Sequence, residues 1–280
     1  MKTSLNTMAN LFPTNNIQKL FTVVLVILLA TDLVNSVSFS ISDFRTIKSS
    51  LILQEYASIS ESGVLELINA SVVTNEVGRA LYTKPIPLWD RSTGNVASFV
   101  TTFSFTLEDI NGSNPPADGL VFVLVPSDGW YPGDSAGGNL GVVDAGKSYN
   151  NFVGVEFDNY INEWDPNYPH IGIDVNSIKS LKTKPWKRVN LALVKVSIAY
   201  DSDSKILSVV LTDDLGQLST VAQVVDFKDA LPETVRVGFS AATSTLSRQV
   251  HNIHSWDFTS ILKTTTSSTN SSANISSYVA

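Results

Sequence analysis

Short apolar runs separated by turn-forming residues make up most of the chain. Between Val37 and Lys263 these runs are rich in β-branched and aromatic residues, and Gly, Pro, Asn and Asp interrupt them. Few show the period of an amphipathic helix, so we expect strands at 96–107, 120–125, 152–157, 170–175, 190–200, 206–212 and 235–241. The run Leu231-Pro232-Glu233 is where we expect a short helical turn.

The spacing of these strands predicts an all-β fold. Evenly spaced strands without intervening helices are typical of a jelly roll or two-sheet β-sandwich. Such folds often form one domain even above about 200 residues. Because no internal repeat or interdomain linker is found, we expect residues 37–263 to form a single domain.

The two ends of the chain differ from this middle part. Lys2 and Lys19 precede an uncharged apolar run, Leu20 to Ala30, and Val34-Asn35-Ser36 follows, so residues 1–36 resemble a signal peptide. The 11-residue run is shorter than a membrane span, which disfavours an anchor. Residues 264–280 are rich in Ser, Thr and Asn and are expected to be a disordered or processed tail. These features predict the secretory pathway, with an extracellular or vacuolar destination.

Composition narrows the classes of partner. The net charge of −7, the pI near 4.9 and the lack of a basic cluster argue against nucleic acid and anionic membranes. The chain has no cysteine, so no disulfide stabilises it, although the secretory pathway would permit one. Core burial and bound metal must therefore stabilise the fold.

An acidic segment with one histidine is the clearest candidate for chemistry. Glu156 and Asp158 are two residues apart on an expected strand, so both side chains leave the same face, and the loop beyond returns Asn162 and Asp165 toward them. Adjacent carboxylates repel each other unless a cation neutralises them. Oxygen donors suit Ca²⁺, and carboxylates with the His170 imidazole suit Mn²⁺ or Zn²⁺, so a binuclear site is one interpretation. A solvated acidic turn is the alternative.

Two longer motifs stand out in the chain, VGVEFD…N..D….HIGIDVNSIKS at residues 153–180 and LPETVRVGFSAAT at 231–243. The first resembles the metal-binding signature of the legume lectins, and the second resembles another signature of that family. SFSISDF at 38–44 and GRALYTKPIPLWD at 78–90 extend the resemblance over essentially the whole expected domain. It implies the concanavalin-like sandwich, bound Ca²⁺ and Mn²⁺ or another transition ion, and reversible binding of carbohydrates or glycoproteins without catalysis.

The resemblance assigns metal ligands position by position. It implies that the transition ion is bound by Glu156, Asp158, Asp165 and His170, with Ser180 acting through a water molecule. It implies that Ca²⁺ is bound by Asp158, the Tyr160 carbonyl, Asn162 and Asp165. Sorting the side chains by ligand hardness gives the same two groups.

The resemblance also implies a sugar site. Asp118 would follow a cis peptide bond from Ala117 and accept from two sugar hydroxyls, and Gly138 would donate its backbone N–H. Asn162 would donate to the sugar while its oxygen holds Ca²⁺, which makes binding metal-dependent. A stacking ring and a specificity loop complete the implied site, in the form of Tyr160, Thr245 and Leu246.

Three positions depart from the family pattern. Asn159 stands where Thr is usual, Thr234 where Trp is usual, and Ser244 where Gly is usual. The first two are expected to affect packing. Ser244 is the first residue of the specificity loop, at a position where Gly permits positive φ. We therefore expect a reshaped loop or a weak affinity for sugar, and the identity of the sugar stays open.

Two other functions compete with the lectin interpretation. Jelly-roll glycoside hydrolases place acids as Glu-x-Asp-x-x-Glu, but the third position here is Ile161, which disfavours an enzyme. A storage or defence protein with weakened or lost sugar binding is the remaining alternative. We also expect a homodimer or homotetramer, because shallow sugar sites gain avidity from multivalency. The Asn-x-Ser/Thr glycosylation candidates are Asn69, Asn111, Asn270 and Asn274.

Overall fold

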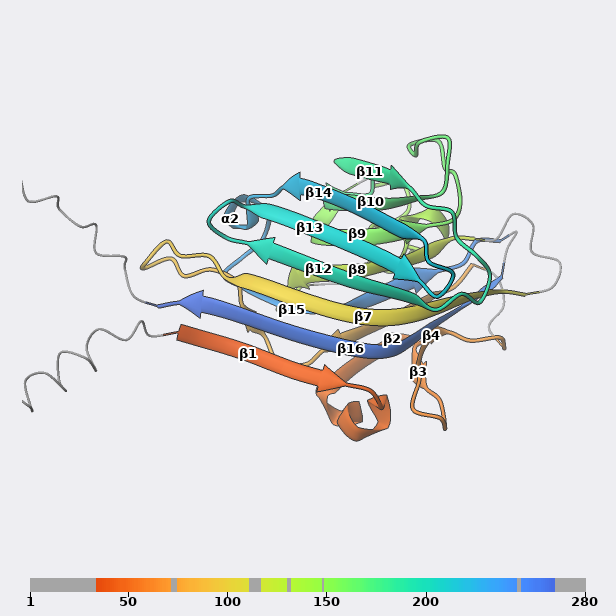
Figure 1. Ribbon diagram of the computed structural model, residues 1–280, viewed down its shortest axis with the longest axis horizontal. Helices are drawn as coiled ribbons and strands as arrows, with labels where there is room; N and C mark the ends of the chain where they lie inside the picture. The colour runs from red at the N-terminus through yellow and green to blue at the C-terminus, as the bar shows by residue number, and fades with distance from the viewer. Residues whose placement is uncertain are drawn as a thin grey trace, which may run out of the picture.

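Two antiparallel β-sheets pack face to face in the computed structural model, which describes residues 34–71, 75–110, 117–129, 132–147, 149–245 and 248–264 (Figure 1). The all-β sandwich expected from the strand spacing is therefore confirmed. Residues 1–33 and 265–280, which hold most of the expected signal peptide and tail, lie outside the described residues.

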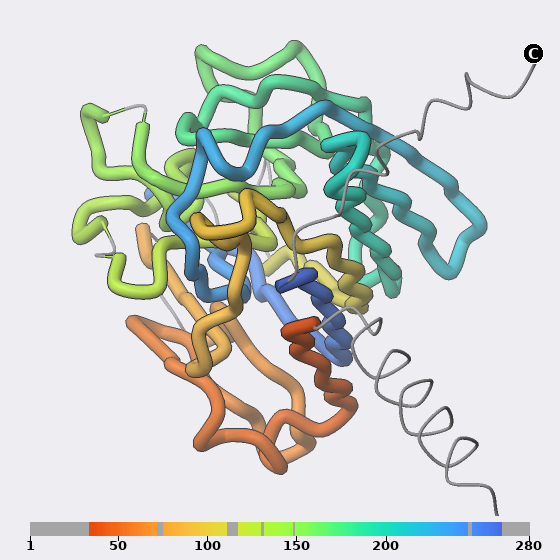
Figure 2. Tube along the Cα trace, turned by 90° about the vertical axis from the view of Figure 1, so that its left-hand side faces the viewer, coloured from red at the N-terminus to blue at the C-terminus, as the bar shows by residue number. Residues whose placement is uncertain are grey.

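The first sheet contains the longest strands. Its order is β14 (Leu218–Val224), β13 (Ile206–Asp213), β12 (Val194–Asp201), β7 (Ser98–Asp109), β16 (Gln249–Lys263), β4 (Leu65–Ile68) and β3 (Ser58–Ile59), and β1 (Val34–Ile41) also pairs with β16. Val34 pairs with Lys263, so the first and last described strands lie side by side, as the red and dark blue tubes in Figure 2 show. This strand begins three residues before the expected start of the domain, Val37.

The second sheet carries the candidate site. Its order is β11 (Lys182–Pro185), β10 (His170–Ser177), β9 (Tyr149–Asp158), β8 (Gly119–Pro126), β15 (Thr234–Ala242), β5 (Val77–Tyr82) and β2 (Leu51–Glu55), and β6 (Ile86–Pro87) also pairs with β15. Each of the seven ranges expected to be a strand overlaps a strand of one of the two sheets.

Helical structure in the described residues is limited to three short segments, η1 (Phe44–Ser50), η2 (Gly137–Asn139) and α2 (Phe227–Ala230). The expected turn at Leu231-Pro232-Glu233 was wrong, because the helical turn precedes it and Leu231 is extended. A residue before proline is disfavoured in the helical region, which ends the turn there. Asp226 caps its start by accepting from Lys228 N at 3.1 Å. No helix among the described residues is long and apolar enough to cross a membrane.

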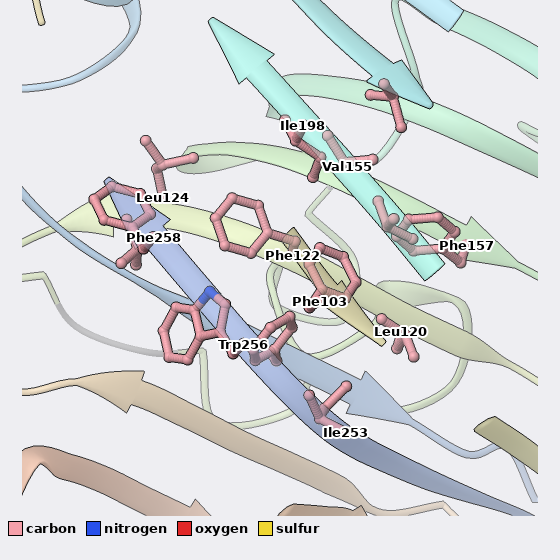
Figure 3. Packing of buried hydrophobic residues seen from close by; sticks show 14 of the residues in the cluster. Phe103, Leu120, Phe122, Leu124, Val155, Phe157, Ile198, Ile253, Trp256 and Phe258 are labelled. Carbon is pink, nitrogen blue, oxygen red and sulfur yellow. The ribbon is translucent and has the colours of Figure 1, made fainter. Parts of the chain in front are cut away.

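The main core lies between the sheets and is rich in aromatic rings. In β7 the inward residues Phe99, Phe103 and Phe105 are buried, whereas Val100 between them is 48% exposed. Phe103 meets Phe239 of the other sheet edge to face, with ring centroids 5.0 Å apart. Figure 3 shows residues of both sheets meeting in this layer. Buried and exposed residues therefore alternate along β7 because one face of the strand packs on the core and the other faces solvent.

A second, smaller core lies on the outer face of the second sheet. Strand β8 is buried along almost its whole length, because alternate residues face the main core and this second cluster. The cluster includes Val121 and Val123 of β8 with Leu140, Val142 and Val143 of the covering segment 132–147. This packing holds the segment that contains η2 beside the second sheet.

Arg79 of β5 holds the same covering segment by hydrogen bonds. Its side chain is only 3% exposed, and its Nε donates to Gly141 O at 2.9 Å. Its Nη2 donates to Pro132 O at 2.7 Å and to Ser135 Oγ at 2.6 Å. These bonds join β5 to residues on both sides of η2, so the position of η2 is set by buried interactions.

Acid sensitivity is expected from His251 in β16. The imidazole is completely buried, and burial lowers its pKa to about 3 from the ordinary 6.5. Below pH 6.5 the unfolded chain therefore binds a proton that the folded chain rejects, and the free energy of unfolding falls by about 1.4 kcal/mol per pH unit. His251→Phe should reduce this loss, which chemical denaturation between pH 4 and 7 would measure.

His254 offers a matched control for that experiment, because it is only partly buried and its Nε2 lies 2.9 Å from Thr106 Oγ1. His254→Gln should change the pH dependence less. The carboxylates are the same in all three proteins, so they cancel from the comparison. If the free energy of unfolding fell equally with decreasing pH in His251→Phe and in the natural protein, the expectation would be contradicted.

Candidate metal centre and adjoining binding site

The centre forms on the outer face of strands β9 and β10. In the β9–β10 ladder, Asp158 lies opposite His170 and Glu156 lies opposite Gly172. The ligand atoms of Glu156, Asp158 and His170 all lie within 4.8 Å of one another, and all three residues are buried. The two-residue spacing in the sequence thus brings both carboxylates to one face, with the imidazole beside them.

Local sequence explains why this face is free for polar groups. Val153, Val155 and Phe157 of β9 point into the main core, so Glu156 and Asp158 point away from it. A Cβ at Gly172 would lie 2.2 Å from Glu156 Oε1 and 2.0 Å from Ser180 Oγ. The glycine therefore leaves the space that the Glu156 carboxylate and the Ser180 hydroxyl occupy.

Asp174 is a member of the centre that the sequence interpretation missed. It is completely buried, and Ser180 Oγ donates to its Oδ1 at 2.6 Å while also contacting Glu156 Oε1. A hydroxyl has one proton, so the two carboxylates share it. The signal was present, because His170, Gly172 and Asp174 alternate along one strand and so share a face.

The loop after β9 folds back onto these carboxylates. Asp158 Oδ1 accepts from Tyr160 N at 2.7 Å, and Asp165 Oδ2 accepts from Asn162 N at 2.7 Å. Asp165 is close enough to act on the ionisation of both Asp158 and Asp118. The structure thus brings the loop residues to the strand residues, as expected from the sequence.

The cluster concentrates negative charge in a buried place. Burial and then the charge of Asp165 raise the pKa of Asp118 to about 7. Burial and then the charge of Glu156 raise the pKa of Asp158 and of Asp174 well above the usual range. Burial opposes charge on His170, but the 2.8 Å contact with Glu156 and the charges of Glu156 and Asp165 together leave the His170 pKa raised. The cluster is therefore poised to bind cations.

Buried acceptor atoms without partners support this interpretation. Within the described part of the chain, no hydrogen bond reaches Asp118 Oδ1 or Oδ2, Asn162 Oδ1, or Asp174 Oδ2. Leaving such acceptors unsatisfied costs about 1–3 kcal/mol each, and more when they are charged. A ligand or metal ion that accepts their lone pairs would remove this cost. Oxygen donors on the loop fit a hard cation, and the imidazole side fits a transition ion.

Asp118 and Gly138 come from separate segments that both contact the loop after β9. The Ala117–Asp118 peptide bond is cis, as expected, and Asn159 N donates to Asp118 O at 2.9 Å. A Cβ at Gly138 would lie 2.3 Å from Asn162 Oδ1, so this glycine directly abuts the Asn162 side chain. Two segments distant in the sequence, one at Asp118 and one at Gly138, therefore reach the loop that carries Asn159 and Asn162.

The remaining candidate residues lie at the rim or outside the described residues. Tyr160 is half-buried and Thr245 is exposed. Gly137 N donates to Thr243 O at 3.1 Å, so the loop that holds Thr245 begins beside η2. Leu246 lies outside the described residues, as do the sequons Asn111, Asn270 and Asn274. Asn69 is half-buried, and its Oδ1 accepts from Ser71 N at 2.9 Å.

The three departures from the family pattern have local explanations. Asn159 is buried, and its Nδ2 donates to Gln249 Oε1 at 2.9 Å. The Thr234 and Ser127 hydroxyls lie 2.8 Å apart. Ser244 is not among the described residues with positive φ, so its side chain causes no backbone strain at the start of the loop.

Comparison with known proteins gives consistent matches over most of the chain. A model of the legume lectin domain matches residues 36–274. A galactose-binding lectin of Arachis hypogaea is 48% identical over 238 residues, which is 84% of this chain and 86% of that protein. An anti-H(O) lectin of Lotus tetragonolobus is 48% identical over 235 residues, 81% of this chain and 98% of that protein.

Solved structures agree with these sequence matches. Peanut lectin with a 9mer peptide superposes with a TM-score of 0.79 at 48% identity, covering 82% of this chain and 100% of that one. The Lotus tetragonolobus seed lectin gives a TM-score of 0.78 at 49% identity, covering 81% and 99%. Both the fold and the sequence of these proteins therefore extend across the described sandwich.

Proposed function

This chain belongs to the legume lectin family, and we propose that it binds carbohydrate at the junction of Asp118, Gly138 and Asn162. It is a carbohydrate-binding protein and not an enzyme. The observation that carries the proposed location is the approach of Gly138 to Asn162, beside a buried carboxylate whose oxygens lack partners in the described residues. Tyr160, Thr245 and Leu246 complete the proposed site.

The recognition chemistry follows from the donors and acceptors at this junction. Sugar hydroxyls would donate to the Asp118 carboxylate and accept from Gly138 N–H and from the Asn162 amide. The Tyr160 ring would pack on the apolar face of the sugar. Thr245 and Leu246 would frame the open side. The site would bind and orient the sugar without a reacting group.

Two cations would organise the site. The residues that would hold Ca²⁺ are Asp158, Tyr160 through its carbonyl, Asn162 and Asp165; those that would hold Mn²⁺ or another transition ion are Glu156, Asp158, Asp165, His170 and, through water, Ser180. When bound, the ions supply positive charge that fixes these side chains. Burial and then repulsion from neighbouring carboxylates raise the pKa values of Asp118 and Asp158, which supports this, because a cation would offset both effects. Asn162 links the two functions, since its oxygen would face the ion and its amide the sugar.

Calorimetric titration with a monosaccharide panel tests the function. Galactose is titrated first, because one relative of this chain is a galactose-binding lectin. Mannose, N-acetylglucosamine and fucose are titrated next. Heat of binding to any of these by the metal-loaded protein would support the proposal and identify the sugar. No binding to any monosaccharide or to a glycan array would favour the alternative, a storage or defence protein that has lost sugar binding.

Gly138→Ala is the matched variant for this titration. The added Cβ would lie 2.3 Å from Asn162 Oδ1, so the Asn162 amide must move. We expect at least about tenfold weaker sugar binding, the loss of roughly one hydrogen bond, with an unchanged circular dichroism spectrum. Gly133→Ala is the control, because a Cβ there meets nothing within 4 Å among the described atoms. Unchanged affinity in Gly138→Ala would exclude this junction as the sugar site.

Assembly and cellular location complete the proposal. A homodimer or homotetramer could form through an edge strand, and the outer strand β14 carries Leu218 and Val224 at 66% and 60% exposure. Light scattering would measure the state. The expected signal peptide supports entry into the secretory pathway, toward the cell exterior or the vacuole, where the Asn69 sequon could receive a glycan.

A further inference from the structure

A buried hydrogen bond joins the bases of the two loops that supply the proposed sugar site. Asn159 directly follows β9 and begins the loop that carries Tyr160 and Asn162. Gln249 is the first residue of β16 and directly follows the specificity loop. Asn159 Nδ2 donates to Gln249 Oε1 at 2.9 Å, and the two residues are 6% and 1% exposed. Since β9 and β16 belong to different sheets, this bond joins the two layers of the sandwich.

Asp109 of β7 fixes the direction of the Gln249 amide. Gln249 Nε2 donates to Asp109 Oδ1 at 2.8 Å, and Arg188 Nη2 donates to Asp109 Oδ2 at 2.5 Å. An ionised carboxylate only accepts hydrogen bonds, so the N–H side of the Gln249 amide faces Asp109 and its oxygen faces Asn159. The residue at position 159 must therefore offer a donor, and the Asn159 amide supplies one.

The backbone of Asn159 is tied to the proposed sugar acceptor. Asn159 N donates to Asp118 O at 2.9 Å, and Asn159 lies between Asp158 and Tyr160 in the sequence. One residue thus bonds to Asp118 through its backbone and to Gln249 through its side chain. A shift of Asn159 relative to β16 would therefore change the place of Asp118 relative to the specificity loop.

The two ends of the specificity loop are attached to different sheets. At its start, Ser244 O accepts from Asn75 N at 3.0 Å, close to β5 of the second sheet. At its end, Gln249 pairs with Asp109 in the β7–β16 ladder of the first sheet. The loop therefore spans the gap between the sheets, and the bond from Asn159 to Gln249 sets that gap beside the site.

We propose that Asn159 and Gln249 are positioning residues that hold the specificity loop at a fixed distance from Asp118. The proposal rests on the proposed sugar site, in which one sugar contacts both Asp118 and Thr245. Its affinity then depends on the distance between the two sheets at this end. The residues assigned to the cations all lie within 156–180, so cation binding does not depend on the place of the specificity loop.

Hydrogen–deuterium exchange of the full chain loaded with Ca²⁺ and Mn²⁺, without sugar, tests the positioning role. Asn159→Thr removes the Nδ2 donor, and Thr is the usual residue at this position, so the sandwich should still form. We expect at least about fivefold faster exchange in peptides that contain Thr245 and Gln249, and no change in β10. Asn151→Thr is the matched control, because Asn151 is exposed near the other end of β9. Equal exchange in Asn159→Thr and the natural protein would overturn the proposal.

Titration with the sugar identified by the panel tests the consequence for binding. Asn159→Thr should bind the sugar about five- to tenfold more weakly and Ca²⁺ with unchanged affinity, a difference that general damage to the fold would not give. If the natural protein binds no sugar, the proposed function fails, whereas the exchange experiment still decides whether the pair positions the loop.

Gln249→Met removes the same bond from the other side and serves if Asn159→Thr fails to fold. Because both changes remove one shared bond, the double variant should bind the sugar no more weakly than Gln249→Met alone. Losses of affinity that add in the double variant would contradict the pairing, as would an equal loss of Ca²⁺ and sugar affinity in Asn159→Thr.

Discussion

Asp118→Asn is expected to weaken carbohydrate binding at least about 100-fold. The proposed site uses the Asp118 carboxylate to accept from two sugar hydroxyls, and a hydrogen bond to a charged group contributes about 1.5–3 kcal/mol. Losing the charge from both bonds therefore costs about two powers of ten or more in affinity. Titration of the metal-loaded variant with the sugar identified by the panel would measure this loss.

The same substitution should stabilise the metal-free protein at pH 7. Burial raises the pKa of Asp118 to about 7 from 3.8, so between these values the folded chain holds a proton that the unfolded chain releases. The free energy of unfolding therefore falls as the pH rises through this range. Asparagine has no charge to bury and removes this loss. Thermal denaturation in EDTA at pH 5 and pH 7 would detect the difference.

Opposite effects on affinity and stability separate a binding role from damage to the fold. Asp214→Asn, an exposed position between β13 and β14, is the control and should change neither property. If Asp118→Asn kept its sugar affinity, the carboxylate would not be the acceptor. If it lost affinity only because it unfolded, the melting temperature would fall together with the affinity.

Removal of metal is expected to abolish sugar binding and to lower the melting temperature, more at pH 7 than at pH 5. Without cations, Asp158, Asp165 and Asn162 lose what holds them beside Asp118 and Gly138. A ligand at 1,000 times its dissociation constant stabilises a protein by about 4 kcal/mol, which is a large part of a typical folding free energy.

The pH dependence follows from competition between protons and cations. The pKa values of Asp118, Asp158 and Asp174 are raised in the metal-free protein, so at pH 5 protons already neutralise part of the cluster. Metal binding must displace those protons and stabilises less. At pH 7 the charges repel unless cations are present. His251 contributes equally to both forms and cancels from the difference.

Calorimetry and thermal scans before and after EDTA treatment would measure both effects. Adding back CaCl₂ and MnCl₂ together should restore the sugar affinity and the melting temperature. Adding each salt alone would show how much each ion contributes to the two properties. Sugar affinity that survives complete chelation would rule out metal organisation of the site. A stabilisation by metal that was larger at pH 5 would contradict the assigned role of the carboxylates.

The strands and the metal cluster could be predicted because both depend on short spacings in the sequence. Residues two apart on a strand share a face, so the sequence alone is enough to place Glu156 and Asp158 together. The same rule applied to His170 would have found Asp174, which lies four residues further along β10. Its complete burial could not be read from this spacing, because the spacing shows which face a side chain leaves but not what covers that face.

Features that depend on packing between distant segments could not be predicted in this way. The contact of Gly138 with Asn162 and the bonds from Arg79 to residues on both sides of η2 join residues that are far apart in the chain. The hydrogen bond from Asn159 to Gln249 likewise depends on the meeting of β9 with β16 of the other sheet. Sequence patterns report which face a side chain leaves, but not which segment covers that face.

The pairing of β1 with β16 makes the fold independent of where the polypeptide begins. Val34 and Lys263 are partners in one ladder, so a short linker could join these two residues. The exposed turn at Gly216, between β13 and β14, could then serve as a new start and end. Such a circular permutant would retain every strand pair and the β9–β10 centre, because the sheets are defined by neighbours in space.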